Sequence, residues 1–122
     1  MPVPWTVEVT DQFEAWWDSL DEDEKVSIDG MIRVLEAHGP SLGPPFTGTG
    51  ASARHPQLRE LRVPHRAGAI CVLYASDEQR STMVLLLGSA LEAGSEGLCT
   101  PEQVREADLI YAAYLARRTG PH

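Results

Sequence analysis

Hydrophobic side chains follow two different periods in the first third of the chain. In residues 3–9 apolar and polar positions alternate, which predicts a strand. Apolar residues then recur every three or four positions, the spacing of a buried helix face, in two successive segments. The first of these faces contains Phe13, Trp16, Trp17 and Leu20, and the second contains Ile28, Met31, Ile32 and Leu35.

Polar residues mark the expected ends of these two helices. Asp11 is the predicted N-cap of the first helix, with Glu14 three residues later. Ser19 and Glu22 form a second predicted capping box, and the acidic run at 21–24 suits the positive end of a helix dipole better than a metal site. Gly39–Pro40 ends the second helix. The short connection predicts an antiparallel helix hairpin.

The rest of the chain predicts three strands and a last helix. The strands are expected at 58–63, 69–75 and 82–87, with loops at 40–56 and 88–99. Thr100, Pro101 and Gln103 have the pattern of a helix start. The apolar face of this helix contains Val104, Ala107, Tyr111, Tyr114 and Leu115. We therefore expect one α+β domain over residues 1–122, with a four-stranded sheet packed on two helices.

Composition restricts the function more than the fold. The 122 residues carry a net charge of −8, and no apolar run is long enough to cross a membrane. The start of the chain does not resemble a signal peptide, and two cysteines make no disulfide framework, so we expect a cytoplasmic protein. Cys71 lies in an apolar run and is expected to be buried. No zinc-type spacing, phosphate-binding glycine loop or nucleophile elbow is present, and no cofactor is expected.

Positive charge is concentrated in residues 54–66, which read R-H-P-Q-L-R-E-L-R-V-P-H-R. This segment has four of the ten Lys and Arg residues and two of the four histidines, against the single acid Glu60. Within its strand, alternation places Glu60 and Arg62 on one face and Arg59 on the other. Such a segment is suited to nucleic acid phosphate, but it is also typical of an edge strand protected by charge. Because the chain is acidic overall, RNA would bind through this patch or not at all.

The order of elements and several short motifs resemble the RelE/HigB-type toxins, and within them the phage Gp49-like branch. The motifs are V-E-V-T-D-Q-F-E-A-W (7–16), L-E-A-H-G-P-S-L-G (35–43), L-R-E-L-R (58–62), V-L-Y-A (72–75), M-V-L-L-L-G (83–88) and A-D-L-I-Y (107–111). Each motif is short, but their order and spacing together cover nearly the whole chain.

This resemblance implies a RelE-like microbial RNase fold and the toxin of a type II toxin–antitoxin system. Such a toxin pairs with a helix-turn-helix antitoxin and cuts mRNA, typically on the ribosome, which inhibits translation. The reaction is metal-independent: the 2′-OH of the RNA attacks the adjacent phosphodiester. The protein must supply a base, an acid and cations for the developing negative charge.

The resemblance assigns some of these roles to residues. Arg62 falls at the family's basic position and is expected to stabilise the phosphate. Arg54 and His55 match an R-H pair before this strand, and Arg80 matches a basic turn. The chemistry of histidine, and not the resemblance, makes His55 and His65 the candidate acid and base. The expected catalytic residues are therefore Arg62, His65, His55 and Arg80, and the expected RNA-binding residues are Arg54, Arg59 and Arg66.

The chain departs from the family pattern at two places. Cys71 stands where an Arg is expected, and residues 89–99 lack the usual Lys and aromatic residues. Three interpretations therefore remain open. The protein is an active toxin with a reduced site, or a toxin-fold protein that binds an antitoxin without cutting RNA, or an unrelated α+β module.

Overall fold

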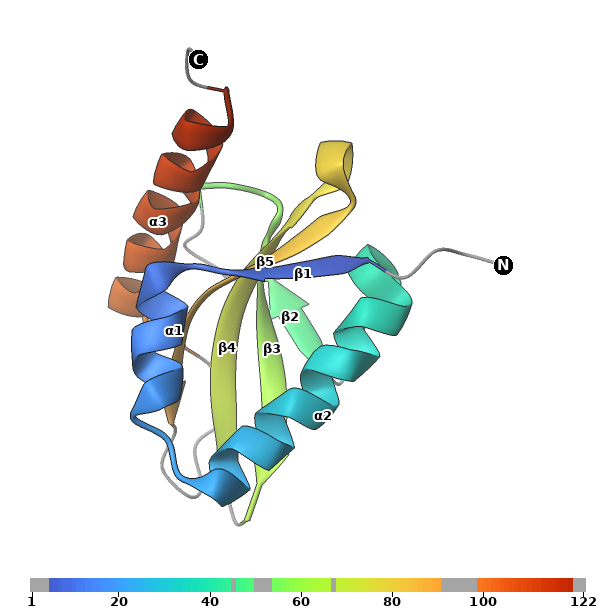
Figure 1. Ribbon diagram of the computed structural model, residues 1–122, viewed down its shortest axis with the longest axis vertical. Coiled ribbons are helices and arrows are strands. Elements are labelled where there is room, and N and C mark those ends of the chain that lie inside the picture. Colours follow the sequence, from blue (N-terminus) through green and yellow to red (C-terminus); the bar gives the residue numbers. More distant parts are fainter. Residues whose placement is uncertain (1–4, 45, 50–53, 67, 91–98, 120–122) are drawn as a thin grey trace.

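The computed structural model describes residues 5–44, 46–49, 54–66, 68–90 and 99–119, and it has five strands and three α-helices (Figure 1). The strands are β1 (Thr6–Val9), β2 (Thr47–Thr49), β3 (Leu58–His65), β4 (Gly68–Asp77) and β5 (Thr82–Ala90). The α-helices are α1 (Asp11–Asp18), α2 (Glu22–His38) and α3 (Pro101–Thr119). Two short 3₁₀ helices, η1 (Gly39–Ser41) and η2 (Glu78–Arg80), complete the described elements.

The strands form one mixed sheet in the order β1-β5-β4-β3-β2. β1 runs parallel to β5, and the other neighbours are antiparallel. The α+β class and the β3–β4–β5 meander are confirmed. The expected number of four strands is wrong, because residues 47–49 of the predicted loop pair with β3 as a fifth strand. Three residues that include Gly48 are too few to give an alternating pattern.

Each face of the sheet packs against helices, as the two hydrophobic clusters show. Side chains of β3, β4 and β5 that point one way pack with Phe13 of α1 and with Ile28 and Leu35 of α2. The side chains that point the other way pack with Val104, Ala107, Ile110, Tyr111 and Tyr114 of α3. Helices α1 and α2 therefore cover one face of the sheet, here called the α2 face, and α3 covers the other, the α3 face (Figure 1).

The first two helices begin one and two residues away from the predicted caps. The cap of α1 is Thr10, whose Oγ1 accepts a hydrogen bond from the backbone N–H of Phe13 at 3.1 Å, so Asp11 is the first helical residue. The cap of α2 is Asp21, which forms a complete capping box with Glu24. Ser19, the predicted cap, instead ends α1. Both corrections have one cause: neighbouring residues have capping side chains, and only the backbone path selects between them.

The predicted start of α3 is confirmed. The Oγ1 of Thr100 accepts the backbone N–H of Gln103 at 3.2 Å, and the Oε1 of Gln103 accepts the N–H of Thr100 at 2.8 Å. These two bonds satisfy N–H groups that the first turn of a helix leaves without partners. They fix the point at which the chain enters α3 and so help to place this helix over the sheet.

The two cysteines are joined, which the sequence analysis did not expect. Cys71 lies on the α3 face of β4, Cys99 lies two residues before α3, and their Cα atoms are 6.0 Å apart, within the range of a disulfide. Cys71 is buried as predicted, but it is not a free thiol. A pairing across 28 residues depends on the packing of α3 against β4, which spacing along the chain does not reveal.

Breaking this disulfide is expected to destabilise the protein by about 3 to 4 kcal/mol, because the bond closes a long loop in the unfolded chain. Cys71→Ser should therefore lower the midpoint of urea unfolding relative to the oxidised wild type. The matched comparison is the wild type in excess reductant, whose urea unfolding midpoint should equal that of Cys71→Ser. Equal midpoints for oxidised wild type and Cys71→Ser would contradict the pairing.

Candidate functional site

Strand β3 presents its basic residues to both faces of the sheet. Arg62 and Glu60 lie on the α3 face, and Arg59 lies on the α2 face beside its cross-strand partner Tyr74. Arg62 is exposed, whereas Glu60 is buried and accepts the backbone N–H of Cys99 at 3.2 Å. Burial raises the pKa of Glu60, and the Cys99 N–H and the charge of Arg62 partly oppose this rise. The guanidinium thus lies at the solvent boundary beside a buried carboxyl.

The pair Arg54–His55 is held by one carboxylate of α3. The Oδ2 of Asp108 accepts the backbone N–H of Arg54 at 2.8 Å, and its Oδ1 accepts that of His55 at 3.1 Å. The same Oδ1 lies 2.9 Å from Nδ1 of the His55 ring. Burial alone would raise the pKa of Asp108, but these hydrogen bonds and the charge of His55 outweigh it, so the pKa lies below its ordinary value.

These contacts leave one nitrogen of His55 available. The side chain is 26% exposed, and the ring edge packs against Tyr111 with centroids 5.0 Å apart. With Nδ1–H assigned as the donor to Asp108, Nε2 is the acceptor of the neutral ring. A cavity of about 430 Å³ adjoins this pair, lined by Arg54, His55, Arg105, Asp108, Leu109 and Ala112. A histidine held by a carboxylate, at a cavity that two arginines also line, can bind an anion and exchange a proton with it.

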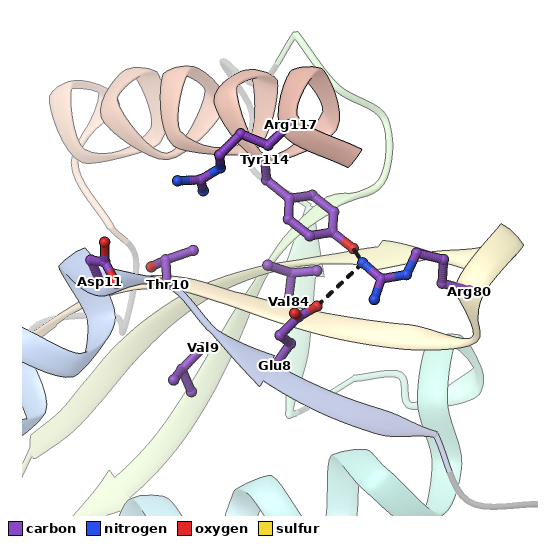
Figure 2. Close-up of a pocket in the computed structure, with 8 residues that line it drawn as sticks. All are labelled: Glu8, Val9, Thr10, Asp11, Arg80, Val84, Tyr114 and Arg117. Carbon is purple, nitrogen blue, oxygen red and sulfur yellow. Dashed lines mark hydrogen bonds and ion pairs between the residues drawn. The ribbon is translucent and has the colours of Figure 1, made fainter. Parts of the chain in front are cut away.

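Arg80 lies at a second cavity, on the β1 side of α3. This cavity of about 290 Å³ is lined mainly by β1, Arg80, Tyr114 and Arg117. Arg80 donates to the hydroxyl oxygen of Tyr114 at 2.9 Å and lies 3.6 Å from the carboxylate of Glu8. Figure 2 shows Arg80 and Tyr114 meeting over Glu8, while Arg117 points away from them. The charge of Arg80 is therefore balanced largely within the protein.

Tyr114 itself is a neutral phenol. Its hydroxyl donates to Asp77 at 2.8 Å. Burial raises the pKa of Tyr114 to about 12, and the hydrogen bond to Asp77 and the charge of Asp77 add to this effect. Tyr114 can donate a hydrogen bond at neutral pH but cannot serve as a base there.

The remaining candidates lie at the β3–β4 turn, on the side of α2. Nδ1 of His65 is 2.9 Å from the Oγ of Ser27, and Arg66 forms an ion pair at 2.9 Å with Asp23. Both contacts join the turn to α2. His65 lies an odd number of residues from Arg62, so the two side chains point to opposite faces of β3. The structure thus separates His65, Arg66 and Arg59 from Arg62, and it places Arg80 on the other side of α3 from Arg54 and His55.

Several residues at these places were missed by the sequence analysis. The sequence analysis assigned Asp108 only to the A-D-L-I-Y motif and Tyr114 only to the apolar face of the last helix. It did not single out Arg105, a cation that lies between Glu102 and Glu106 in that helix. Their roles depend on what packs against α3, so no local pattern reveals them. The A-D-L-I-Y motif contains Asp108, and a buried Asp inside an apolar helix face was the one available signal.

Among the described residues, Glu60, Cys71 and Cys99 are the one group with metal-ligand atoms close together, within 4.8 Å of one another. Because the two sulfurs form a disulfide, they offer no thiolate to a metal in this state. Within the same part of the chain, no helix has the length and apolar character needed to cross a membrane.

The family model described as phage derived protein Gp49-like matches residues 15–89. Two proteins of Mycobacterium tuberculosis (strain ATCC 25618 / H37Rv) are similar in sequence. The one named toxin HigB2 is 32% identical over 116 residues, which is 94% of this chain and 56% of that protein. The one named toxin HigB3 is 36% identical over 78 residues, 63% of this chain and 66% of that protein. The chain therefore spans little more than half the length of HigB2.

Solved structures of RelE proteins share the fold. The M. tuberculosis toxin–antitoxin complex RelBE2 contains a chain with a TM-score of 0.54 and 18% identity, covering 73% of this chain and all of that one. The archaeal RelE–RelB complex from Pyrococcus horikoshii OT3 contains a chain with a TM-score of 0.50 and 18% identity, and the match covers 70% of this chain and 93% of that one. An E. coli RelE mutant in the free state has a TM-score of 0.53 and 9% identity, and the match covers 93% of this chain and 97% of that one. At these identities the likeness concerns the fold alone.

Asp108→Asn is expected to lower the free energy of unfolding by about 2 kcal/mol at pH 7, because the charged acceptor of three hydrogen bonds is lost. The folded-state pKa of Asp108 lies below its ordinary value of 3.8. The carboxylate therefore stabilises the fold above pH 3.8, and this contribution is lost as the pH falls through the folded-state pKa.

The difference between wild type and Asp108→Asn should thus be present at pH 7 and should shrink in urea unfolding below pH 3.8. Asp29→Asn is the control, because Asp29 is half exposed and forms a surface pair with Arg33. It should change the unfolding free energy by well under 1 kcal/mol. If Asp108→Asn and Asp29→Asn changed the unfolding free energy of the wild type by the same amount at every pH, the role of Asp108 would be contradicted.

Proposed function

We propose that this chain, which belongs to the Gp49-like family of phage-derived proteins, is the toxin of a type II toxin–antitoxin module and inhibits translation by cutting mRNA. The main support is the identity of about one third with proteins named HigB toxins, over nearly the whole chain in one case. The RelE fold adds to this support. We further propose that the protein acts in the cytoplasm, where its mRNA substrate lies. The Cys71–Cys99 disulfide removes the cysteine content as a support for this location.

The groups on the α3 face suit the chemistry of this reaction. Attack of a 2′-OH on the adjacent phosphodiester needs a base for the hydroxyl, an acid for the leaving 5′-oxygen and cations for the phosphorane. Nε2 of His55 is the proposed proton-transfer atom, since Asp108 holds the other ring nitrogen. Arg54, an exposed residue beside His55, is the proposed contact for the reacting phosphate, and Arg62, farther along β3, is the proposed contact for a neighbouring phosphate.

The positions of the other candidate residues change the roles that we propose for them. Arg80 has Tyr114 and Glu8 as partners, so its proposed role is to hold the η2 turn against α3 and to line the second cavity. His65, Arg66 and Arg59 lie toward α2, and we propose that they contact RNA outside the reacting phosphate. His55 is then the proposed proton-transfer group for both halves of the step: Nε2 takes the proton of the 2′-OH and, once protonated, gives it to the leaving 5′-oxygen.

A second function is supported by one specific observation. Position 71, where the resembling toxins carry an Arg, is fully buried under α3 and tied to Cys99. The chain therefore lacks a cation there, and loss of one positioned cation commonly costs a factor of 10² to 10³ in rate. A toxin-fold protein that binds an antitoxin without cutting RNA is the alternative. The edge strands β1 and β2 would be available to such a partner.

Expression of the wild-type protein alone is expected to slow bacterial growth and translation, and Arg62→Ala should relieve the effect because the RNA loses a phosphate contact that positions it. The matched control is Arg33→Ala, since Arg33 is an exposed arginine of α2 paired with Asp29. This control should be as toxic as the wild type. Growth rate and labelled amino acid incorporation are the readouts. No slowing by the wild type at an equal protein level would contradict the nuclease function.

The proposed partner is a helix-turn-helix antitoxin, expected from the adjacent gene. Co-expression of the two proteins should restore growth and should give a complex that survives affinity purification and size-exclusion chromatography. Arg62→Ala should bind the same antitoxin, so that its loss of toxicity reflects chemistry and not loss of the fold. Failure of the wild type to co-purify with the antitoxin would remove this part of the proposal.

A further inference from the structure

An exposed aromatic side chain lies beside Arg62 in space, although the two residues are far apart in the sequence. Phe46 precedes β2, and its carbonyl oxygen accepts the backbone N–H of Arg62 at 2.8 Å. In the neighbouring pair, Thr47 lies opposite Leu61. The bond to Phe46 therefore extends the β2–β3 ladder by one residue pair, Phe46 opposite Arg62.

The two side chains of this pair lie on the same face. Thr47 and Leu61 are buried, and Leu61 packs with the α2 face of the sheet. Alternation then places Phe46 and Arg62 on the α3 face, and directly opposite residues have Cβ atoms roughly 4.5–5.5 Å apart. Phe46 is 40% exposed, and Arg62 is exposed as well. We therefore expect the ring of Phe46 and the side chain of Arg62 to share this exposed face.

This pair differs from an ordinary exposed apolar residue in two ways. The large hydrophobic residues exposed in the described part of the chain are Val9, Val26, Phe46 and Leu109, and Phe46 is the aromatic one among them. In addition, a cationic residue, Arg62, lies opposite it across the β2–β3 pairing. On a chain with a net charge of −8, the cation beside the ring favours an anionic partner with flat apolar groups.

Resting on the proposed function, we infer that Phe46 and Arg62 together bind one nucleotide of single-stranded RNA, the ring of Phe46 stacking on the base and Arg62 contacting the phosphate. Unpaired bases stack on aromatic side chains in many RNA-binding proteins, and the stacking tolerates any base. A guanidinium fork matches two phosphate oxygens.

Phe46 has a positioning role in this account. His55 lies three residues before β3, and Arg62 lies about 13 Å along that strand from Leu58, at 3.3 Å per residue. The stacked nucleotide is therefore separate from the His55–Asp108 pair, and it holds the strand so that another phosphate can reach that pair. No proton transfer is assigned to Phe46.

The test uses binding of a fluorescein-labelled eight-nucleotide 2′-O-methyl RNA, which cannot be cut by 2′-OH attack. Fluorescence anisotropy at several salt concentrations gives the dissociation constant and its salt dependence. The variants are Phe46→Ala, Phe46→Leu, which keeps an apolar side chain but has no ring, and Arg62→Ala. Val26→Ala is the matched control, because Val26 is 68% exposed on α2. Thermal unfolding followed by circular dichroism verifies that each variant is folded.

The two residues should leave different signatures. Phe46→Ala and Phe46→Leu should each weaken binding about 5-fold to 100-fold, with an unchanged slope of log K against log salt. Arg62→Ala should weaken binding and lower the magnitude of that slope by about 0.7, the value for one phosphate contact on a single strand. Val26→Ala should bind as the wild type does.

The outcomes separate this inference from the proposed function. If the wild type binds the RNA and both Phe46 variants bind it equally well, the inference is overturned and the nuclease proposal stands. If the wild type does not bind the RNA, the inference is overturned, and the nuclease proposal is then decided by the growth and translation assay alone. If Phe46→Ala binds RNA normally but no longer co-purifies with the antitoxin, the surface is a protein interface and the inference is overturned.

Discussion

The packing of α3 on the sheet is the contact on which the rest of the structure depends. This helix buries Ala107, Tyr111 and Tyr114 against β4 and β5, and its two flanks carry the polar groups that organise the surface. Asp108 on one flank holds Arg54 and His55, and Tyr114 on the other holds Arg80. If the helix were shifted along its axis by one turn, these side chains would move by about 5 Å, and the hydrogen bonds of Asp108 and Tyr114 to these partners would be lost. The disulfide before its first turn and the Thr100 capping box fix the same register.

Much of the fold could be predicted because burial imposes a period on the sequence. β4 and β5 are buried on both faces and read as apolar runs, and α2 shows its buried stripe at Ile28 and Leu35. The helix starts were less accessible to prediction, because Thr10 and Asp11 can both cap and only the backbone path selects one. Strand β2 is invisible in the sequence because its three residues obtain their hydrogen bonds from β3.

The site was predicted less well than the fold, for a related reason. The basic segment at 54–66 identifies the cations but not their surroundings, and alternation along β3 sends Arg62 and His65 to opposite faces. The partners that give the other candidates their geometry, Asp108 and Phe46, come from distant parts of the chain. Cys71–Cys99 illustrates the same limit, since its Cα separation of 6.0 Å exists only once α3 is docked.

An acidic protein can still meet RNA if its cations are gathered on one surface. The α3 face carries Arg62, Arg54 and His55, while the acids of residues 21–24 lie at the start of α2 on the opposite side of the sheet. The departure at position 71 has a structural correlate: this position lies in the core under α3, where an unpaired guanidinium would be costly. At this position the chain has a covalent link between β4 and the segment that leads into α3.

The most direct test of the central claim, that the α3 face supports RNA cleavage by 2′-OH attack, is a comparison of two synthetic mRNAs in a purified translation system. They differ only by a 2′-deoxy substitution at the nucleotide where the wild-type protein cuts. The account predicts cleavage of the all-ribose mRNA, with 5′-hydroxyl and 2′,3′-cyclic phosphate ends, and no cleavage at the substituted position. Cleavage of both mRNAs at the same position, or of neither, would contradict it.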